Sequence, residues 1–330
     1  MSRIVRFNQT GGPEVLQIVE EQVSPPKAGE VQIKVHTIGL NRAESMYRSG
    51  HYLEVPQLPS RLGYEAAGIV SAIGEGVTEF KVGDAVSTIP AFSMNQYGAY
   101  GELVNMPVHA VAKHPANLSW VEASAIWMQY TTAYGALVDI ANTKADDFVL
   151  ITAASSSVGV AAIEIANLIG AIPVAMTRTS QKKDALLKAG AKYVIASEEQ
   201  DLVAEVNKIT NGKGVNVVFD PVAGPTITKL AEATAQGGII FQYGALSTEP
   251  TPLPLFTVLS KQLTIRGYTL FELSTNPVRL AKAKQFVIDG LASGKLKPTI
   301  AKTFPFEQII EAHRYMESNQ QIGKIVVTLG

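Results

Sequence analysis

The chain has 330 residues, 46% of them hydrophobic and 17% charged, with a formal net charge of −1, so it can bury a large core in two domains but has no bulk attraction to nucleic acid. The absence of cysteine excludes disulfides, thiolate metal sites and a cysteine nucleophile, and it fits a reducing cytoplasm. No apolar run is long enough to span a membrane, and the first residues lack the apolar core of a signal peptide, so we expect a cytoplasmic protein without a membrane anchor.

The first hundred residues are rich in β-strand patterns. Residues 15–23 and 30–40 alternate between polar and apolar side chains, and a Pro-Pro-Lys-Ala-Gly turn separates the two runs. Glycines then recur among β-branched residues from Gly63 to Val86. Regular glycines in this setting are typical of a small, tightly bent barrel.

The same stretch carries a family pattern. G-x-E-x-x-G-x-V, then G-x-x-V, then G-D-x-V are met at Gly63, Glu65, Gly68, Val70, Gly74, Val77, Gly83, Asp84 and Val86. A further mark, G-x-Y-x-E, follows at Gly98, Tyr100 and Glu102. This region resembles the N-terminal GroES-like domain of the medium-chain dehydrogenases/reductases, and the resemblance covers essentially the whole chain.

The resemblance also indicates a branch of that family. Asn41 and Tyr64 stand where the alcohol dehydrogenases place a cysteine and a histidine ligand of catalytic zinc, and a short segment, Ala91 to Tyr97, replaces the structural-zinc lobe. None of the five histidines shows metal-ligand spacing with a carboxylate. The chain is therefore similar to the zinc-independent quinone oxidoreductases (the zeta-crystallin-like group), and we expect no metal.

A second domain is predicted over residues 121–268. Six apolar strand patterns alternate with helices that stop at glycines, which favours a doubly wound parallel sheet of the Rossmann type. The strands are expected at residues 148–154, 172–177, 193–196, 215–219, 238–243 and 263–266. The tail, residues 269–330, contains a helix capped by Asn276-Pro277, a second helix near 307–318 and a strand at 324–329. The resemblance implies that this tail rejoins residues 1–120, so that the α/β chain has a discontinuous GroES-like β-barrel domain.

A strand, a loop of small residues and a helix follow one another from Phe148 to Ala166. The dinucleotide fingerprint G-x-G-x-x-G reads here as Ala154, Ser156 and Gly159, and the last glycine would let helix and strand pack closely. A left-handed backbone at Ser156 would cost more than at glycine. We expect phosphate on the backbone N–H groups at the helix start, with contacts from Ser155, Ser156, Ser157, Val158 and Gly159. The alternative is an ordinary strand-to-helix turn.

The end of the second predicted strand identifies the cofactor. Sites specific for NAD place an acid there to bind the ribose hydroxyls, whereas this chain has Thr177, followed by Arg178, Ser180 and Lys182. Arginine offers a bidentate fork to a 2′-phosphate and lysine a point charge, so we predict NADPH rather than NADH. A solvated basic helix start, with Ser180 as its cap, is the alternative.

Further cofactor contacts are implied by the resemblance alone. Thr132 corresponds to a threonine near the nicotinamide, and Lys324, after Gly323, to a C-terminal cofactor contact. Tyr243 and Gly244 end the fifth predicted strand, at the carboxyl edge where ligands of such sheets lie. Each of these residues also has a plain structural interpretation, Gly244 as a turn and Thr132 as a cap.

The resemblance places Asn41 and Tyr52 beside the substrate, as donors to an oxygen that gains charge. The family's other tyrosine corresponds to Met46 here, with Tyr47 beside it. Tyr64 and Trp127 are further candidates for residues near the substrate. We predict an NADPH-dependent oxidoreductase that passes hydride to small quinones or α,β-unsaturated carbonyls and acts as a homodimer. The alternatives are an enoyl-thioester or other medium-chain reductase, and a non-catalytic NADPH- or RNA-binding relative.

Overall fold

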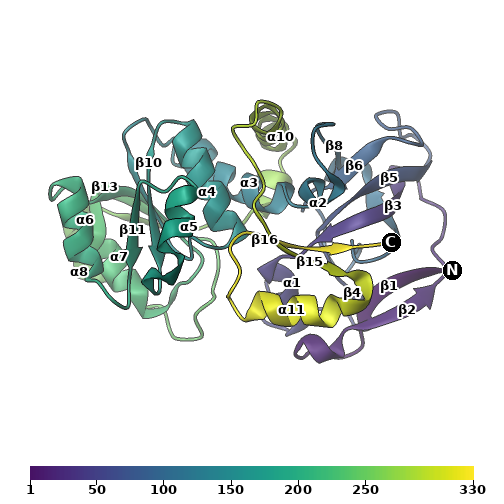
Figure 1. Cartoon of the computed structure of the whole chain (residues 1–330), viewed down its shortest axis with the longest axis horizontal. Helices are drawn as coiled ribbons and strands as arrows, with labels where there is room; N and C mark the ends of the chain where they lie inside the picture. Colours follow the sequence, from purple (N-terminus) through teal and green to yellow (C-terminus); the bar gives the residue numbers. More distant parts are fainter. The chain divides into compact units, whose positions relative to one another are not determined.

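A computed structural model describes the whole chain, Met1–Gly330. The chain divides into two compact units, whose helices and strands are labelled in Figure 1. Unit 1 is discontinuous and consists of Met1–Met128 and Pro298–Gly330, whereas unit 2 is Gln129–Lys297. The divisions thus fall at 128/129 and 297/298, where the sequence placed them at 120/121 and 268/269. No helix of the chain combines the length and the apolar character that a membrane crossing requires.

Unit 1 is built on a long central strand, β3 (Glu30–Gly39), which pairs antiparallel with three other strands. The sheet has the order β15-β16-β3-β5-β6-β8, with β7 also on β3, and a separate sheet has the order β2-β1-β4. Their bounds are β5 Glu65–Ile73, β6 Ala85–Thr88, β7 Leu103–Pro107, β8 Val111–Lys113, β15 Ile300–Pro305, β16 Lys324–Thr328, β1 Ser2–Phe7, β2 Gln17–Glu21 and β4 Ser60–Arg61.

A motif glycine explains how closely the central strands approach. A Cβ on Gly68 in β5 would lie 2.1 Å from the carbonyl oxygen of Lys34 in β3, closer than real atoms come. The pairing of β3 with β5 also shifts register twice, between Gln32 and Ile33 and between Val35 and Thr37. Such bulges bend a strand, as expected from glycines set among β-branched residues.

The helices of unit 1 are short. They are α1 (Arg42–Arg48), α2 (Trp120–Ala123) and α11 (Ile309–Glu317), with a 3₁₀ turn, η6 (Phe306–Gln308), before the last. Further 3₁₀ turns, η1 (Pro13–Val15) and η2 (Val108–Ala110), lie in the first segment. Helix α3 (Trp127–Tyr134) contains the division between the units.

Unit 2 contains a six-stranded sheet in which every pair of neighbours is parallel. Its order is β11-β10-β9-β12-β13-β14, so the chain starts at the centre, builds one half outward and then returns for the other. This is the doubly wound order predicted from the alternating pattern. The bounds are β9 Phe148–Ile151, β10 Ile172–Thr177, β11 Tyr193–Ala196, β12 Val215–Asp220, β13 Thr234–Gln242 and β14 Thr264–Gly267.

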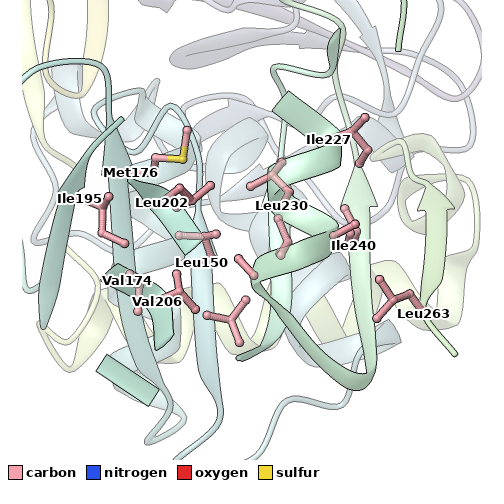
Figure 2. Packing of buried hydrophobic residues seen from close by; sticks show 14 residues of the cluster. Leu150, Val174, Met176, Ile195, Leu202, Val206, Ile227, Leu230, Ile240 and Leu263 are labelled. Carbon is pink, nitrogen blue, oxygen red and sulfur yellow. The ribbon is translucent and has the colours of Figure 1, made fainter. Parts of the chain in front are cut away.

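The helices of unit 2 mostly connect these strands, and the last two come after the final strand. They are α4 Ser157–Leu168, α5 Lys183–Lys188, α6 Leu202–Thr210, α7 Ile227–Ala233, α8 Leu255–Lys261, α9 Phe271–Ser274 and α10 Pro277–Ala292, with 3₁₀ turns η4 Ser180–Lys182 and η5 Gly224–Thr226 and a π-helix, η3 Gly135–Ile140. Figure 2 shows one core layer, where Leu150, Val174 and Ile240 of the sheet meet Val206 of α6 and Leu230 of α7. Their near-complete burial is the main stabilising contribution here.

Candidate functional site

The turn between β9 and α4 has the form of a phosphate-binding turn. The Oγ of Ser156 caps α4 by accepting a hydrogen bond from the Gly159 N–H at 3.0 Å. A Cβ on Gly159 would lie 2.6 Å from the backbone of Ala154, so only glycine allows this helix to start so close to the strand. The residue of the turn with a left-handed backbone is Ala153 (φ +45°), whereas Ser156 is extended. The conformational free-energy cost that the sequence predicted for Ser156 therefore arises at Ala153.

Two loops at the carboxyl edge of the sheet are joined by a hydrogen bond from a lysine side chain. The Nζ of Lys182, in η4 after β10, donates to the Oγ of Ser155, in the turn after β9, at 3.1 Å. Partial burial and the neighbouring Arg178 guanidinium lower the pKa of Lys182. An anion bound at this place would favour the charged form of Lys182 and offset the repulsion from Arg178. Ser157 and Val158 form the first turn of α4 beside Ser155.

The end of β10 contains no acid, as the sequence indicated, but an acid from the next strand lies close. Glu199, which follows β11, accepts a hydrogen bond from the Ser180 N–H at 2.8 Å, and this contact lowers its pKa. Sequence reasoning missed Glu199, because nothing in the local pattern pairs it with Ser180. Arg178 itself is exposed to solvent.

Asp220, at the end of β12, organises the same edge and was also missed. Its buried carboxylate accepts hydrogen bonds from Thr152 after β9, from the backbone N–H of Val222 and Ala223, and from Gln242 Nε2 at the end of β13. One carboxylate therefore ties three neighbouring strand ends together. An Asp directly after a buried strand is the signal that would have found it.

The ends of β13 and β14 present polar atoms that lack partners. The Tyr243 ring stacks on Phe219 with centroids 3.9 Å apart, and its buried hydroxyl makes no hydrogen bond. The hydroxyl of Tyr268 and the Oε1 of Gln242 are likewise buried and unpartnered. Burial of an unsatisfied polar atom is unfavourable, so these atoms suit a polar ligand. Position 244 also requires glycine for a structural reason, because a Cβ there would lie 2.8 Å from the Pro221 carbonyl oxygen. Thr132 lies buried in α3.

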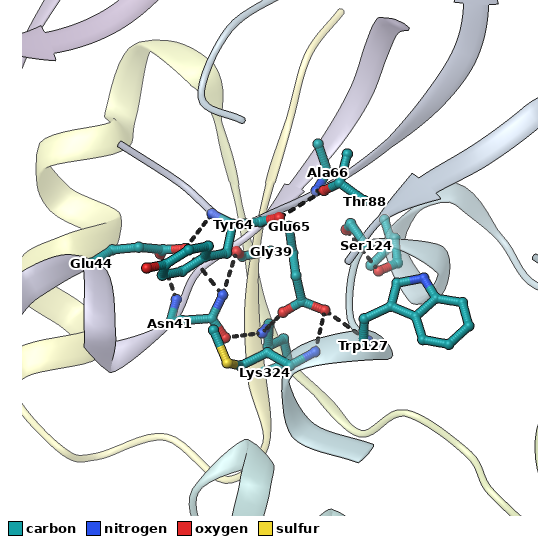
Figure 3. A network of polar contacts seen from close by, with 12 residues as sticks. Gly39, Asn41, Glu44, Tyr64, Glu65, Ala66, Thr88, Ser124, Trp127 and Lys324 are labelled. Atoms are coloured by element: carbon teal, nitrogen blue, oxygen red, sulfur yellow. Dashed lines mark hydrogen bonds and ion pairs between the residues drawn. The ribbon is translucent and has the colours of Figure 1, made fainter. Parts of the chain in front are cut away.

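Unit 1 holds a buried polar network around Lys324, which Figure 3 shows. The Lys324 ammonium forms an ion pair with Glu65 and donates to the Oδ1 of Asn41 at 2.5 Å. The other carboxylate oxygen of Glu65 accepts from the backbone N–H of Trp127 and Met128 at 2.8 and 3.0 Å. Lys324, which the resemblance made a cofactor contact, is thus engaged with Glu65 and Asn41 inside unit 1.

Asn41 begins α1 and is held by the first turn of that helix. Its backbone N–H donates to Glu44 Oε2 at 2.7 Å, and its amide Nδ2 donates to the Gly39 carbonyl at 3.2 Å and to Glu44 Oε1 at 3.1 Å. Complete burial raises the pKa of Glu44, against the opposing effect of hydrogen bonds from Tyr100 and Tyr64 N–H. Both amide hydrogens of Asn41 are therefore already in use.

Tyr52 and Tyr47 of unit 1 differ in how their hydroxyl groups are engaged. Burial, beside the neighbouring Tyr64, raises the pKa of Tyr52 to about 12, so the Tyr52 hydroxyl remains protonated and can donate at neutral pH. Tyr47, by contrast, is fully buried and its hydroxyl bonds Ser60 and Asn95. Trp127 is buried too, with its Nε1–H on Ser87 at 2.8 Å.

The histidine side chains do not assemble a metal site. No group of three or more His, Cys, Asp or Glu side chains is placed to hold an ion. His313 is fully buried beside Arg48, whose guanidinium lies 2.8 Å from its Nδ1, and burial together with Arg48 lowers the pKa of His313 to about 3.

Comparisons with known proteins agree with this architecture. Residues 27–116 match the alcohol dehydrogenase GroES-like domain and residues 189–327 match the zinc-binding dehydrogenase domain. The chain is 34% identical to quinone oxidoreductase 1 of Escherichia coli over 98% of each protein, and 32% identical to the human quinone oxidoreductase over 100% of this chain and 98% of that one. The structure of the Escherichia coli quinone oxidoreductase complexed with NADPH superimposes with a TM-score of 0.90, at 33% identity and 99% coverage of both chains.

A discontinuous GroES-like unit together with a doubly wound sheet of order β11-β10-β9-β12-β13-β14 defines the medium-chain dehydrogenase/reductase class of oxidoreductases. Within that class, the chain belongs to the quinone oxidoreductase family. The fold class and the family predicted from the glycine pattern are therefore confirmed, and the chain is an enzyme of the oxidoreductase type.

Proposed function

We propose that this protein is an NADPH-dependent oxidoreductase that reduces small quinones or α,β-unsaturated carbonyl compounds without zinc. The observation that carries the proposal is the pair of cations after β10, Lys182 bonded to Ser155 and Arg178 beside it, at the edge where doubly wound sheets bind dinucleotides. A relative of 33% identity was crystallised with NADPH.

Residues of unit 2 would hold the cofactor. Arg178, Lys182 and Ser180 suit the 2′-phosphate, and the N-terminus of α4 with residues 155–159 suits the pyrophosphate. The buried, unpartnered hydroxyl of Tyr243 offers a partner to a polar group of the ligand, and Thr132 and Gly244 are further candidates from the family resemblance. When bound, NADPH supplies the hydride, which is the difficult chemistry of the reaction.

Residues of unit 1 would stabilise the substrate. A quinone or enone that accepts a hydride gains negative charge on oxygen, and a preorganised donor lowers the barrier. Tyr52 suits this role, since its raised pKa of about 12 keeps the hydroxyl protonated at neutral pH. We assign direct contact to Tyr52. Asn41 would contribute by releasing its longest bond, the one to the Gly39 carbonyl, or by acting through water.

We further propose that the enzyme is a cytoplasmic homodimer. Helix α8, next to β13, leaves Leu255, Phe256 and Leu259 50%, 86% and 63% exposed, which favours burial against a second copy. The unpaired edge of β14 lies in the same half of the sheet. The absence of cysteine suits a reducing compartment.

A panel of substrates tests the proposed reaction. Purified protein would be mixed with NADPH and a small quinone or enone and, in a separate assay, with NADP⁺ and a simple alcohol. Turnover in both assays would be followed by the absorbance of the reduced cofactor. We expect turnover of quinones or enones and negligible oxidation of alcohols. Rapid oxidation of simple alcohols, with no reduction of any quinone or enone, would rule the proposal out.

A further inference from the structure

The segment Tyr52–Pro59 joins α1 to β4 and carries the proposed donor Tyr52. It contains no helix or strand, and none of its backbone groups takes part in a backbone–backbone hydrogen bond. Pro56 is its one fully buried residue and Tyr52 is half-buried, whereas Leu53 and Val55 are 73% and 76% exposed. Secondary structure therefore does not fix the conformation of this segment, and most of its apolar side chains are exposed.

A single side chain, Asn95, binds the segment at three points. Its Nδ2 donates to Glu54 Oε1 at 2.8 Å and to the Val55 carbonyl at 2.9 Å, and its Oδ1 accepts from the Gln57 N–H at 2.7 Å. The same Oδ1 accepts from the buried hydroxyl of Tyr47 on α1, also at 2.7 Å. Four hydrogen bonds exhaust what an amide can form in this geometry.

Glu54 completes the attachment from inside the segment. Besides Asn95, its carboxylate accepts from the Ser93 hydroxyl and from the Met94 N–H. Phe92, one residue before Ser93, packs its ring on Tyr64 with centroids 5.5 Å apart, and Tyr64 is a close electrostatic neighbour of Tyr52. The short stretch Phe92–Asn95 therefore contacts both the segment next to Tyr52 and the ring of its neighbour Tyr64.

We infer that Asn95 is a positioning residue for the reduction, which fixes Tyr52–Pro59 so that the Tyr52 hydroxyl is oriented before substrate binds. The inference rests on the proposed role of Tyr52. Without Asn95, a segment of eight residues would lose most of its polar attachments, and Tyr52 would sample orientations that must be restricted again in each turnover. A misplacement of about 1 Å is enough to cost up to a hundredfold in rate.

The kinetic test compares Asn95→Ala with a matched variant, Asn105→Ala. Asn105 also lies in unit 1 and donates to a backbone carbonyl, that of Ser24, while accepting from Gln32, but it does not touch the segment. We expect Asn95→Ala to lower kcat for a small quinone roughly tenfold or more, and Asn105→Ala to change it less than about twofold. Equal losses in both variants would overturn the inference.

A double substitution separates positioning from general destabilisation. If Asn95 acts through Tyr52, then Asn95→Ala should have little further effect on kcat in a Tyr52→Phe background, because the donor is already absent. The same loss in both backgrounds would indicate a merely structural role. A Tyr52→Phe variant with unchanged kcat would likewise overturn the inference, since there would be no donor to position.

Hydrogen exchange gives a readout that does not depend on activity. Gln57 has the one N–H of the segment that is hydrogen-bonded, and its acceptor is Asn95. We expect its exchange to be fast in Asn95→Ala and unchanged in Asn105→Ala. Unaltered exchange in Asn95→Ala would overturn the inference. A wild-type protein that reduces no quinone or enone would instead contradict the proposed function, and Gln57 would still reveal whether Asn95 holds the segment.

Discussion

Lys324 and Glu65 form an ion pair whose side chains are 0% and 1% exposed, although 259 residues separate them in the sequence. Burial of two charges carries a large desolvation cost, which is offset only where further hydrogen bonds satisfy both groups. Here Asn41 accepts from the ammonium, and two backbone N–H groups, of Trp127 and Met128, donate to the carboxylate. The pair links the first residue of β16 to the first residue of β5, and so connects the C-terminal segment of unit 1 to its N-terminal segment.

We predict that Lys324→Met is strongly destabilising, by about 3–5 kcal/mol, because it leaves the Glu65 carboxylate buried without its cation. Adding Glu65→Gln should restore much of that loss, since a neutral amide oxygen still accepts from Trp127 and Met128. Urea unfolding of the single and double variants measures the difference. If the double variant is as unstable as Lys324→Met, the loss comes from packing rather than from charge.

Much of the fold could be predicted because its signals are local. The strand over residues 172–177 and that over 193–196 were predicted with the bounds that the structure gives, since each is a short apolar run between glycine and polar residues. The cap at Asn276 was also visible in the sequence, and its side chain accepts from the N–H of Val278 and Arg279.

The position of helix α10 depends on contacts that the sequence does not display. Phe286 packs on Tyr134 with ring centroids 5.0 Å apart, and Arg279 pairs with Asp139, 140 residues earlier. These long-range contacts assign α10 to unit 2, and the division falls at 297/298 rather than near 268. The engagement of Asn41 with Glu44 and Lys324 was missed for the same reason, because one of its two partners is 283 residues away.

Replacement of Arg178 should change cofactor choice. Arg178→Ala would remove a charge-assisted bond of roughly 1.5–3 kcal/mol to a 2′-phosphate, and exposure of the side chain reduces this toward the lower end. At about 1.4 kcal/mol per decade, the NADPH affinity should fall about tenfold while the NADH affinity barely changes. Calorimetric titration measures both, with Lys188→Ala, at the end of α5, as control. Equal losses for the two cofactors would indicate a structural role.

The protein should contain no stoichiometric zinc. By the family resemblance, Asn41 and Tyr64 correspond to ligand positions of the zinc-dependent relatives, and the side chain of Asn41 is already hydrogen-bonded to Gly39, Glu44 and Lys324. We expect elemental analysis to find far less than one zinc per chain, and quinone reduction to be unaffected by a chelator. One tightly held zinc per chain, with activity lost on its removal, would contradict the assignment to the zinc-independent branch.

Glu164 should make stability depend on pH. Burial raises the pKa of this carboxyl, which accepts from Tyr130, from its ordinary value of 4.5 to about 7. The folded state therefore binds the proton more tightly than the unfolded state, and stability falls as pH rises from about 4.5 to 7, by at most about 3 kcal/mol. Glu164→Gln should remove this slope and stabilise the protein above pH 7. Thermal unfolding against pH measures it, and parallel curves for variant and wild type would refute the prediction.

Tyr52 is the residue whose replacement should affect the reaction most directly. Zinc in the alcohol dehydrogenases polarises a carbonyl as a Lewis acid, and a simple ketone lacks an activator without it. A conjugated carbonyl needs less assistance, because the incoming charge spreads onto an oxygen that one or two hydrogen bonds stabilise. Tyr52→Phe would remove one such bond, worth about 1.4 kcal/mol in the transition state, so kcat should fall roughly tenfold.

Tyr97→Phe provides the matched control for Tyr52→Phe. The Tyr97 hydroxyl donates to Glu30 at 2.9 Å, in the same unit but in a contact of its own, so we expect kcat to be unchanged. The pKa of Tyr52, about 12, also predicts that the wild-type rate with quinones varies little with pH up to about pH 10, because the donor remains protonated. If Tyr52→Phe reduces quinones as fast as the wild type, the donor is another group, while the reaction class is retained because it rests on family membership and on the cations after β10.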